Sequence, residues 1–163
     1  MKNTLKIFLS LFVVLSISLF TGCYEHFPLD QDLTRTQNTF LNQDSVKVQF
    51  PKIIKDKITV LAMVYTHCPD ICPMTTHNMQ LVEQKLSADL RKNVKFVVIS
   101  FDPNRDTPSV LKKFAEIRDI TFDNWTLLSG DEQNTKEVML KIGVKAITTE
   151  SSYDFIDRSG RQA

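Results

Sequence analysis

ITVLAMVYTHCPDICP, residues 58–73, runs from an apolar segment into two closely spaced cysteines. Its first half, residues 58–65, is a continuous run of β-branched and apolar residues, which is typical of a strand buried on both faces of a parallel sheet. Residues 94–101 (VKFVVISF) repeat this pattern. Two such segments in succession predict a pair of parallel strands joined by a crossover connection.

The crossover segment carries apolar residues at helical spacing, namely Met79, Val82, Leu86 and Leu90. This spacing predicts an amphipathic helix from about Pro73 to Leu90, and therefore a βαβ unit. Thr107 and Pro108 suit the N-cap and first position of a second helix. Further on we expect a strand and turn at 125–131, a helix at 132–142 capped by Gly143, and a strand at 153–157. The alternation predicts an α/β fold, a central mostly parallel sheet flanked by helices.

The beginning of the chain is typical of a lipoprotein-type signal peptide. Two lysines precede an uncharged apolar run at 7–20. That run is too short to span a bilayer, which takes about 20 residues. It ends in LFTGC, which is similar to the lipobox of bacterial lipoproteins, so Cys23 is predicted to be lipidated. We therefore expect a signal peptide (1–22), a polar tether (23–38) and one domain (39–163).

Charge gives no reason to expect a nucleic-acid partner. The whole chain has a formal net charge of +1, and removal of residues 1–22 deletes two lysines and no acidic residue, which leaves −1. Binding of nucleic acid relies on clustered positive charge. The sequence instead predicts an exported domain, anchored to the cell membrane by lipid, in the periplasm or on the outer face.

The two cysteines, Cys68 and Cys72, lie where the first predicted strand ends and the crossover helix begins. Open α/β sheets place ligands at this edge. The helix N-terminus there favours negative charge, so we expect a lowered thiol pKa. Ideal helix geometry puts the two Cα atoms about 6.2 Å apart, which is within the roughly 4.4–6.8 Å that a disulfide accepts. Spacing alone leaves three possibilities open: a structural disulfide, a redox couple, or a clamp for Cu(I).

Three successive motifs, YTHCPDICP, VVISFDPNRDTPSVLKKFAE and NWTLLSGD, resemble the signatures of the Sco/SenC family. Members are membrane-tethered, thioredoxin-like copper chaperones of cytochrome c oxidase assembly. The resemblance covers about residues 40–143. It implies a thioredoxin-like fold, copper bound by the thiolates of Cys68 and Cys72, and Asp102 near the site.

One feature of the family pattern is missing. The histidine that supplies the third copper ligand in the family would fall near Thr149, and no histidine follows His77. The chain also stops where relatives continue, so the C-terminal elements of the family fold are expected to be missing and the copy to be truncated or divergent. His67 and His77 are expected to point away from the site, His26 to lie in the tether, and Met79 to be a core residue.

The missing histidine has a consequence for the oxidation state of the metal. Two thiolates suffice for Cu(I), whereas Cu(II) favours a tetragonal set that includes nitrogen. We therefore expect Cu(I) binding to be retained and Cu(II) binding to be weak. An intense thiolate-to-Cu(II) absorption band would contradict this expectation.

The function that the resemblance implies is delivery of copper to cytochrome c oxidase, with its copper-centre subunit or another cysteine-containing protein as partner. The alternative is a thiol-disulfide oxidoreductase that reduces the cysteines of a partner through the redox pair Cys68 and Cys72. A truncated, inactive copy is a third possibility. The sequence does not decide whether the chain is an enzyme, but it favours a metallochaperone over a thiol-disulfide oxidoreductase.

Overall fold

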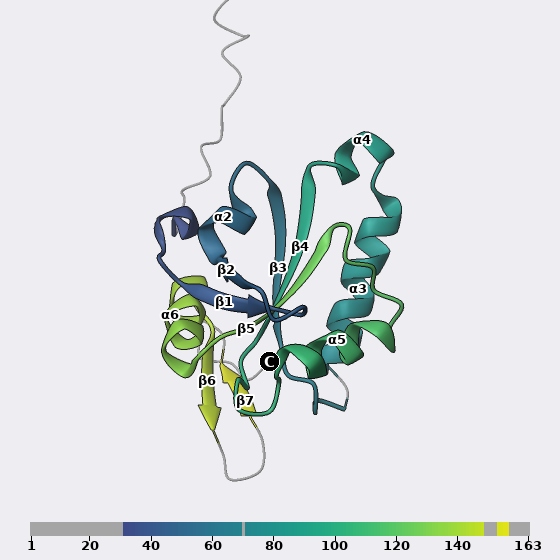
Figure 1. Cartoon of the computed structure of the whole chain (residues 1–163). Helices are drawn as coiled ribbons and strands as arrows, with labels where there is room; N and C mark the ends of the chain where they lie inside the picture. Colours follow the sequence, from purple (N-terminus) through teal and green to yellow (C-terminus); the bar gives the residue numbers. More distant parts are fainter. Residues whose placement is uncertain (1–30, 70, 149–152, 157–163) are drawn as a thin grey trace, which may run out of the picture. The chain divides into compact units, whose positions relative to one another are not determined.

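The computed structural model describes residues 31–69, 71–148 and 153–156. Its main feature is a five-stranded sheet in the order β2-β1-β5-β4-β3 (Figure 1). The strands are β1 (Thr39–Asn42), β2 (Lys47–Gln49), β3 (Ile58–Val64), β4 (Val94–Ser100) and β5 (Trp125–Ser129). β3, β4 and β5 run parallel, whereas β1 is antiparallel to both β2 and β5. The predicted α/β class is confirmed.

Helices connect these strands. They are a 3-10 helix η1 (Leu33–Arg35) and the α-helices α2 (Phe50–Ile54), α3 (Ile71–Lys85), α4 (Ala88–Arg91), α5 (Pro108–Glu116) and α6 (Glu132–Ile142). A separate two-stranded antiparallel sheet consists of β6 (Lys145–Thr148) and β7 (Tyr153–Ile156). The predicted strands and the helices at 108 and 132 are confirmed, while β1, β2 and α2 were not predicted.

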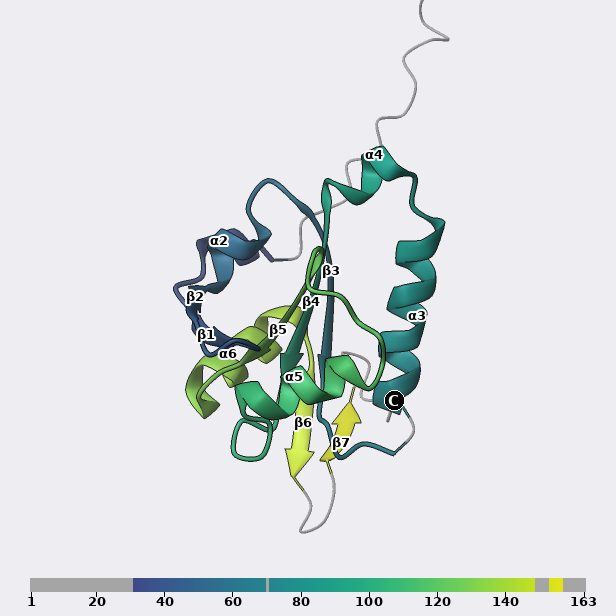
Figure 2. The same cartoon turned by 45° about the vertical axis from the view of Figure 1, so that its right-hand side comes forward.

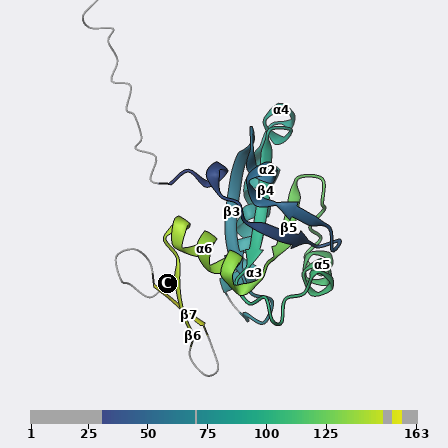
Figure 3. The same ribbon diagram turned by 60° about the vertical axis from the view of Figure 1, so that its left-hand side comes forward.

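Two hydrophobic clusters cover the two faces of the sheet. Along β4, Phe96 and Val98 belong to one cluster and Val97 and Ile99 to the other, as the alternation of a strand requires. The first cluster takes in residues of α3 and α5, and the second takes in residues of α2 and α6. Figure 3 accordingly shows α5 and α6 on opposite sides of the sheet, and Figure 2 shows α3 and α5 on the nearer side.

The position of each strand in the sheet explains one wrong expectation. β4 is central and nearly all of it is buried. β3 was expected to be buried on both faces, but it is the edge strand and only Val64, at its C-terminal end, is fully buried. The apolar run of β3 therefore predicted a parallel strand correctly, but it predicted more burial than the strand has.

The crossover helix is shorter than predicted and buries a different face. α3 ends at Lys85, and a separate short helix, α4, begins after Ser87, whose hydroxyl caps it. Val82 and Leu90 are exposed, whereas Cys72, Thr76 and Met79 are the buried residues of α3. The buried stripe includes a threonine and the cysteine itself, so apolar spacing alone did not find it.

The folded unit begins before Thr39. Thr36 and Asn38, in the segment assigned to the tether, are buried. The amide of Asn38 donates hydrogen bonds to the side chains of Asn134 (3.2 Å) and Glu137 (2.8 Å) on α6. Residues 33–38 are thus part of the packed structure, while the predicted signal peptide and Cys23 lie outside the described residues.

Candidate functional site

The two cysteines lie at the C-terminal end of β3 and the start of α3, as the sequence predicted. Cys68 is in the loop between these elements, and Cys72 is the second residue of α3. The backbone N–H of Cys68 bonds to the carbonyl of Tyr65 (3.3 Å), which closes a four-residue turn. The loop therefore carries Cys68 back toward the first turn of α3.

The two thiols are adjacent but differ in exposure. Neither forms a disulfide, and the backbone N–H of Cys72 donates a hydrogen bond to Sγ of Cys68, 3.4 Å away. Cys72 is only 5% exposed and belongs to the hydrophobic cluster that α3 and α5 share, whereas Cys68 is partly exposed and packs against that cluster. The pair thus places a partly exposed cysteine beside a buried one.

The expected lowering of the thiol pKa is wrong for Cys72. Burial raises the pKa of its thiol to about 12, and a hydrogen bond with the Cys68 side chain and the negative charges of Cys68 and Asp106 act in the same direction. A hydrogen bond from the Tyr65 backbone has the opposite effect. Loss of water around a thiolate inside an apolar cluster outweighs the favourable helix N-terminus.

Tyr65 is a neighbour of the thiols that the sequence did not reveal. Its ring packs on that of Phe101, with centroids 5.0 Å apart. Burial raises the pKa of the Tyr65 hydroxyl, and a hydrogen bond with the Cys68 side chain raises it further. Tyr65 thus gives Cys68 a polar neighbour.

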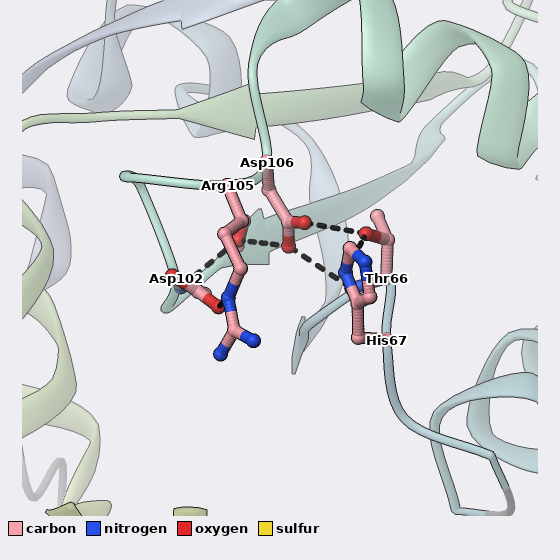
Figure 4. A network of polar contacts seen from close by, with 6 residues as sticks. Thr66, His67, Asp102, Arg105 and Asp106 are labelled. Carbon is pink, nitrogen blue, oxygen red and sulfur yellow. Dashed lines mark hydrogen bonds and ion pairs between the residues drawn. The ribbon is translucent and has the colours of Figure 1, made fainter. Parts of the chain in front are cut away.

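Behind the loop, Asp106 forms a buried polar network, shown in Figure 4. The Asp106 carboxylate accepts hydrogen bonds from the Ser100 hydroxyl (2.6 Å) and from both the backbone N–H (3.0 Å) and the hydroxyl (2.5 Å) of Thr66. Asp106 is completely buried. The sequence indicated no role at the site for Asp106, although it lies in the same DPNRDTP motif as Asp102.

Asp102 itself lies at the end of β4 and is 2% exposed. Its carboxylate pairs with Arg105, and its backbone N–H donates to the Ser100 hydroxyl (3.0 Å). The backbone carbonyl of Asp102 accepts from the N–H of Asp106 (2.9 Å). Asp102 therefore shapes the loop that holds Asp106, and a role for its carboxylate at the thiols stays a prediction.

The other sequence candidates are exposed residues, a core residue, or residues outside the described ranges. His77 is exposed on α3, and Met79 is a buried core residue as expected. His67 is exposed and its Nδ1 lies 3.3 Å from the Thr66 hydroxyl. His26 and Thr149 lie outside the described residues. Within residues 31–69, 71–148 and 153–156, no group of three or more His, Cys, Asp or Glu side chains is placed to hold a metal ion.

Among the described residues, the donor atoms that lie together at the site are the sulfurs of Cys68 and Cys72. Thiolates are soft ligands of the kind that bind copper.

The chain is similar to several known proteins. The SCO1 protein homolog of Bacillus subtilis is 36% identical over 109 residues, which cover 67% of this chain and 55% of that protein. The chain thus spans about half the length of that relative.

Among solved structures, a SCO1/SenC family lipoprotein from Bacillus anthracis is 30% identical with a TM-score of 0.63, and 84% of each chain is covered. Bradyrhizobium japonicum ScoI with copper bound is 28% identical with a TM-score of 0.59, covering 77% of this chain and 84% of that one. The fold is therefore the thioredoxin-like fold of Sco proteins. Since residues 28–160 also match the SCO1/SenC family model, the chain belongs to the SCO1/SenC family.

Proposed function

We propose that this chain binds Cu(I) through Cys68 and Cys72 and delivers it to cytochrome c oxidase. The observation that carries the proposal is the adjacency of two cysteines at the start of α3, neither in a disulfide, one buried and one partly exposed. Support also comes from the similarity to ScoI, whose structure contains copper. The copper-centre subunit of the oxidase is the proposed partner, and another protein with paired cysteines is the alternative recipient.

The difference between the two thiols suits a transfer site. A copper ion held by Cys68 and Cys72 would have one thiolate ligand from a buried residue and one from a partly exposed residue that packs against the same cluster. An acceptor thiolate then approaches from the side of Cys68 and replaces it first, while Cys72 still holds the ion. Both thiols lose their protons to the solvent when copper binds, because the thiolate is the ligand.

The test is an anaerobic Cu(I) titration of the reduced full chain against a competing chelator. We expect one tightly held copper per chain, lost in both Cys68→Ser and Cys72→Ser. His77→Ala is the matched control, because His77 is exposed on the same helix, and it should bind as the unaltered chain does. A folded chain that competes for no Cu(I) contradicts the proposal.

The oxidation state is tested with the same protein. Because the described site offers two sulfurs and no third group that completes a metal site, Cu(II) should bind weakly. The expected result is that Cu(II) added anaerobically gives no intense thiolate-to-copper absorption band. Such a band at one equivalent would show that a further ligand completes the site.

A second candidate function, reduction of a partner disulfide, is favoured by the hydrogen bond between Cys72 and Sγ of Cys68. The Cys68 thiolate attacks one sulfur of the partner disulfide, and the other partner sulfur leaves and takes a proton. The Cys72 thiolate then attacks Sγ of Cys68 and releases the second partner thiol. Two electrons and two protons pass to the partner, and a Cys68–Cys72 disulfide remains.

Trapping of a mixed disulfide with a partner protein distinguishes the oxidoreductase from the copper chaperone. In an oxidoreductase, Cys72→Ser should accumulate a mixed disulfide between Cys68 and its partner, which a non-reducing gel reveals. A copper chaperone binds Cu(I) in the unaltered chain and accumulates no such species. Cys68→Ser serves as the control, because it removes the attacking sulfur.

We also propose that a lipid on Cys23 anchors the domain outside the cytoplasm. The solved Bacillus anthracis relative is a lipoprotein. No helix in the described part of the chain is long and apolar enough to cross a membrane. The test is metabolic labelling with a fatty acid: label should enter the full chain and be absent from Cys23→Ala, and equal labelling of both contradicts the proposal.

A further inference from the structure

The buried carboxylate of Asp106 connects three segments around the thiols. Its contacts reach Thr66 in the loop after β3 and Ser100 at the end of β4. It also stands directly before Thr107, the N-cap of α5. These three hydrogen bonds come from the segments that end or follow the parallel strands β3 and β4, and Figure 4 shows those between Asp106 and Thr66.

Thr66 is the residue through which this network reaches the cysteines. It lies at the second position of the turn from Tyr65 to Cys68, which the Cys68 N–H closes. Asp106 binds both the backbone N–H and the hydroxyl of Thr66, so it fixes the position of its main chain and of its side chain. The next contact along this path is the bond from the Cys72 N–H to Sγ of Cys68.

Burial of a carboxylate is costly unless hydrogen bonds compensate for the lost water. Here the compensation comes from one serine and one threonine, and the threonine lies two residues before Cys68. Asp106 therefore acts on the dithiol through Thr66 and the turn that ends at Cys68.

We propose that Asp106 is a positioning residue for the dithiol: by holding Thr66 it fixes the turn that presents Cys68 beside Cys72. This inference rests on the proposed function for its copper readout. The reduction potential of the pair is a second readout that needs no copper. Groups that orient metal ligands typically contribute 10- to 100-fold to metal affinity, and we expect an effect of that order here.

The decisive variants are Asp106→Asn, Thr66→Val and Thr66→Ser in the full chain. Asp106→Asn keeps the shape and removes the charge, and Thr66→Val keeps the shape and removes the hydroxyl. Both should weaken Cu(I) binding in the chelator competition by on the order of 10-fold or more. Thr66→Ser retains the hydroxyl and should bind close to the level of the unaltered chain.

Loss of the hydrogen bonds that hold the turn should also disfavour the Cys68–Cys72 disulfide, because a disulfide requires the two sulfurs to be in contact. In equilibrium with a glutathione buffer, the constant for disulfide formation should fall about tenfold in both Asp106→Asn and Thr66→Val, which corresponds to a potential about 30 mV higher. Thr66→Ser should leave it unchanged. If the unaltered chain binds no Cu(I), this measurement still decides the role of Asp106.

A general loss of fold stability has to be distinguished from a local effect on the position of the two cysteines. Asn38→Ala is the matched control, since it removes a buried polar group whose partners Asn134 and Glu137 are on α6. It should lower the free energy of unfolding without changing the potential or the Cu(I) affinity. If Asp106→Asn does not fold, Thr66→Val carries the test. Unchanged potential and Cu(I) affinity in Thr66→Val would overturn the proposal.

Discussion

The backbone N–H of Cys72 donates a hydrogen bond to Sγ of Cys68 across 3.4 Å. This contact places Sγ of Cys68 at the first turn of α3, and a hydrogen bond between the two cysteine side chains brings the sulfurs together without a disulfide. A disulfide between residues four apart is compatible with ordinary disulfide geometry. The reduced structure is therefore already close to the arrangement that an intramolecular disulfide requires.

We predict that a mild oxidant converts the chain to a monomer with a Cys68–Cys72 disulfide. The mass should fall by two hydrogen atoms, and Cys72→Ser should instead form intermolecular disulfides. Because so short a loop restricts the unfolded chain little, oxidation should add no more than about 2 kcal/mol to the free energy of unfolding. Urea unfolding of the oxidised and reduced forms measures this difference, and a much larger gain would show that oxidation rearranges the site.

The second prediction concerns the pH dependence of stability of the reduced chain. The folded structure raises the pKa of Cys72 to about 12, whereas an unfolded cysteine has a pKa of about 8.5. Between these values the unfolded chain has released this proton and the folded chain retains it. The stabilisation from a neutral Cys72 is therefore complete below about pH 8.5 and is lost as the pH rises toward about 12.

The measurement is the free energy of unfolding against pH, in the presence of a phosphine reductant. Cys72 should contribute a fall of about 1.4 kcal/mol for each pH unit within this window. Cys72→Ala is the comparison, since every other group, including Tyr65 and Lys95, titrates in both proteins. If the free energy of unfolding fell equally with pH in the unaltered chain and in Cys72→Ala, the raised pKa of Cys72 would be contradicted.

The sequence predicted the parallel strands and the helices with standard caps because their signals are local. Thr107 accepts a hydrogen bond from the N–H of Val110, and Gly143 takes the left-handed conformation at the end of α6 with a φ of 77°, both as expected. β1 and β2 were missed because each is only three or four residues long, and β1 joins the sheet by pairing with β5, which is distant in the sequence. How deeply β3 is buried also depends on which strands lie beside it, and a local sequence pattern does not contain this information.

At the site, the sequence located the cysteines but not the groups that govern them. The adjacency of Cys68 and Cys72 follows from their spacing. The pKa of Cys72 does not, because it depends on the hydrophobic cluster that α3 and α5 form around it. Asp106 was missed for a similar reason: its partner Thr66 is 40 residues away in the sequence, and only the parallel pairing of β3 and β4 brings them together.

A third prediction concerns Glu83 and Trp125, the sole tryptophan. The indole N–H of Trp125 donates to the Glu83 carboxylate at 2.6 Å, and the indole stacks on Phe96 with centroids 4.8 Å apart. Glu83→Ala leaves this buried N–H without its acceptor and should cost about 1–3 kcal/mol of stability. Glu83→Gln keeps an uncharged acceptor and should cost less. Urea unfolding followed by tryptophan fluorescence measures both, and equal losses would show that the hydrogen bond contributes little.

The last prediction concerns Gly130, which follows β5. A Cβ atom at this position would lie 2.6 Å from two ring carbons of Phe40 and 3.0 Å from the Thr135 hydroxyl. Phe40 is 1% exposed and packs edge-on against Phe50, with ring centroids 6.0 Å apart, so its ring has little room to move. Gly130→Ala should therefore destabilise the fold by about 1–3 kcal/mol through overpacking.

A double-mutant cycle with Phe40→Leu identifies the cause. Leucine removes the ring that the new methyl group would meet, so Gly130→Ala should cost less in that background than in the unaltered chain. Residues in contact typically show such coupling at about 0.5–3 kcal/mol. If the two losses simply add, the cost of Gly130→Ala comes from the backbone and not from Phe40. Cu(I) binding should survive in each folded variant, because Gly130 and Phe40 pack on the α6 side of the sheet, away from Cys68 and Cys72.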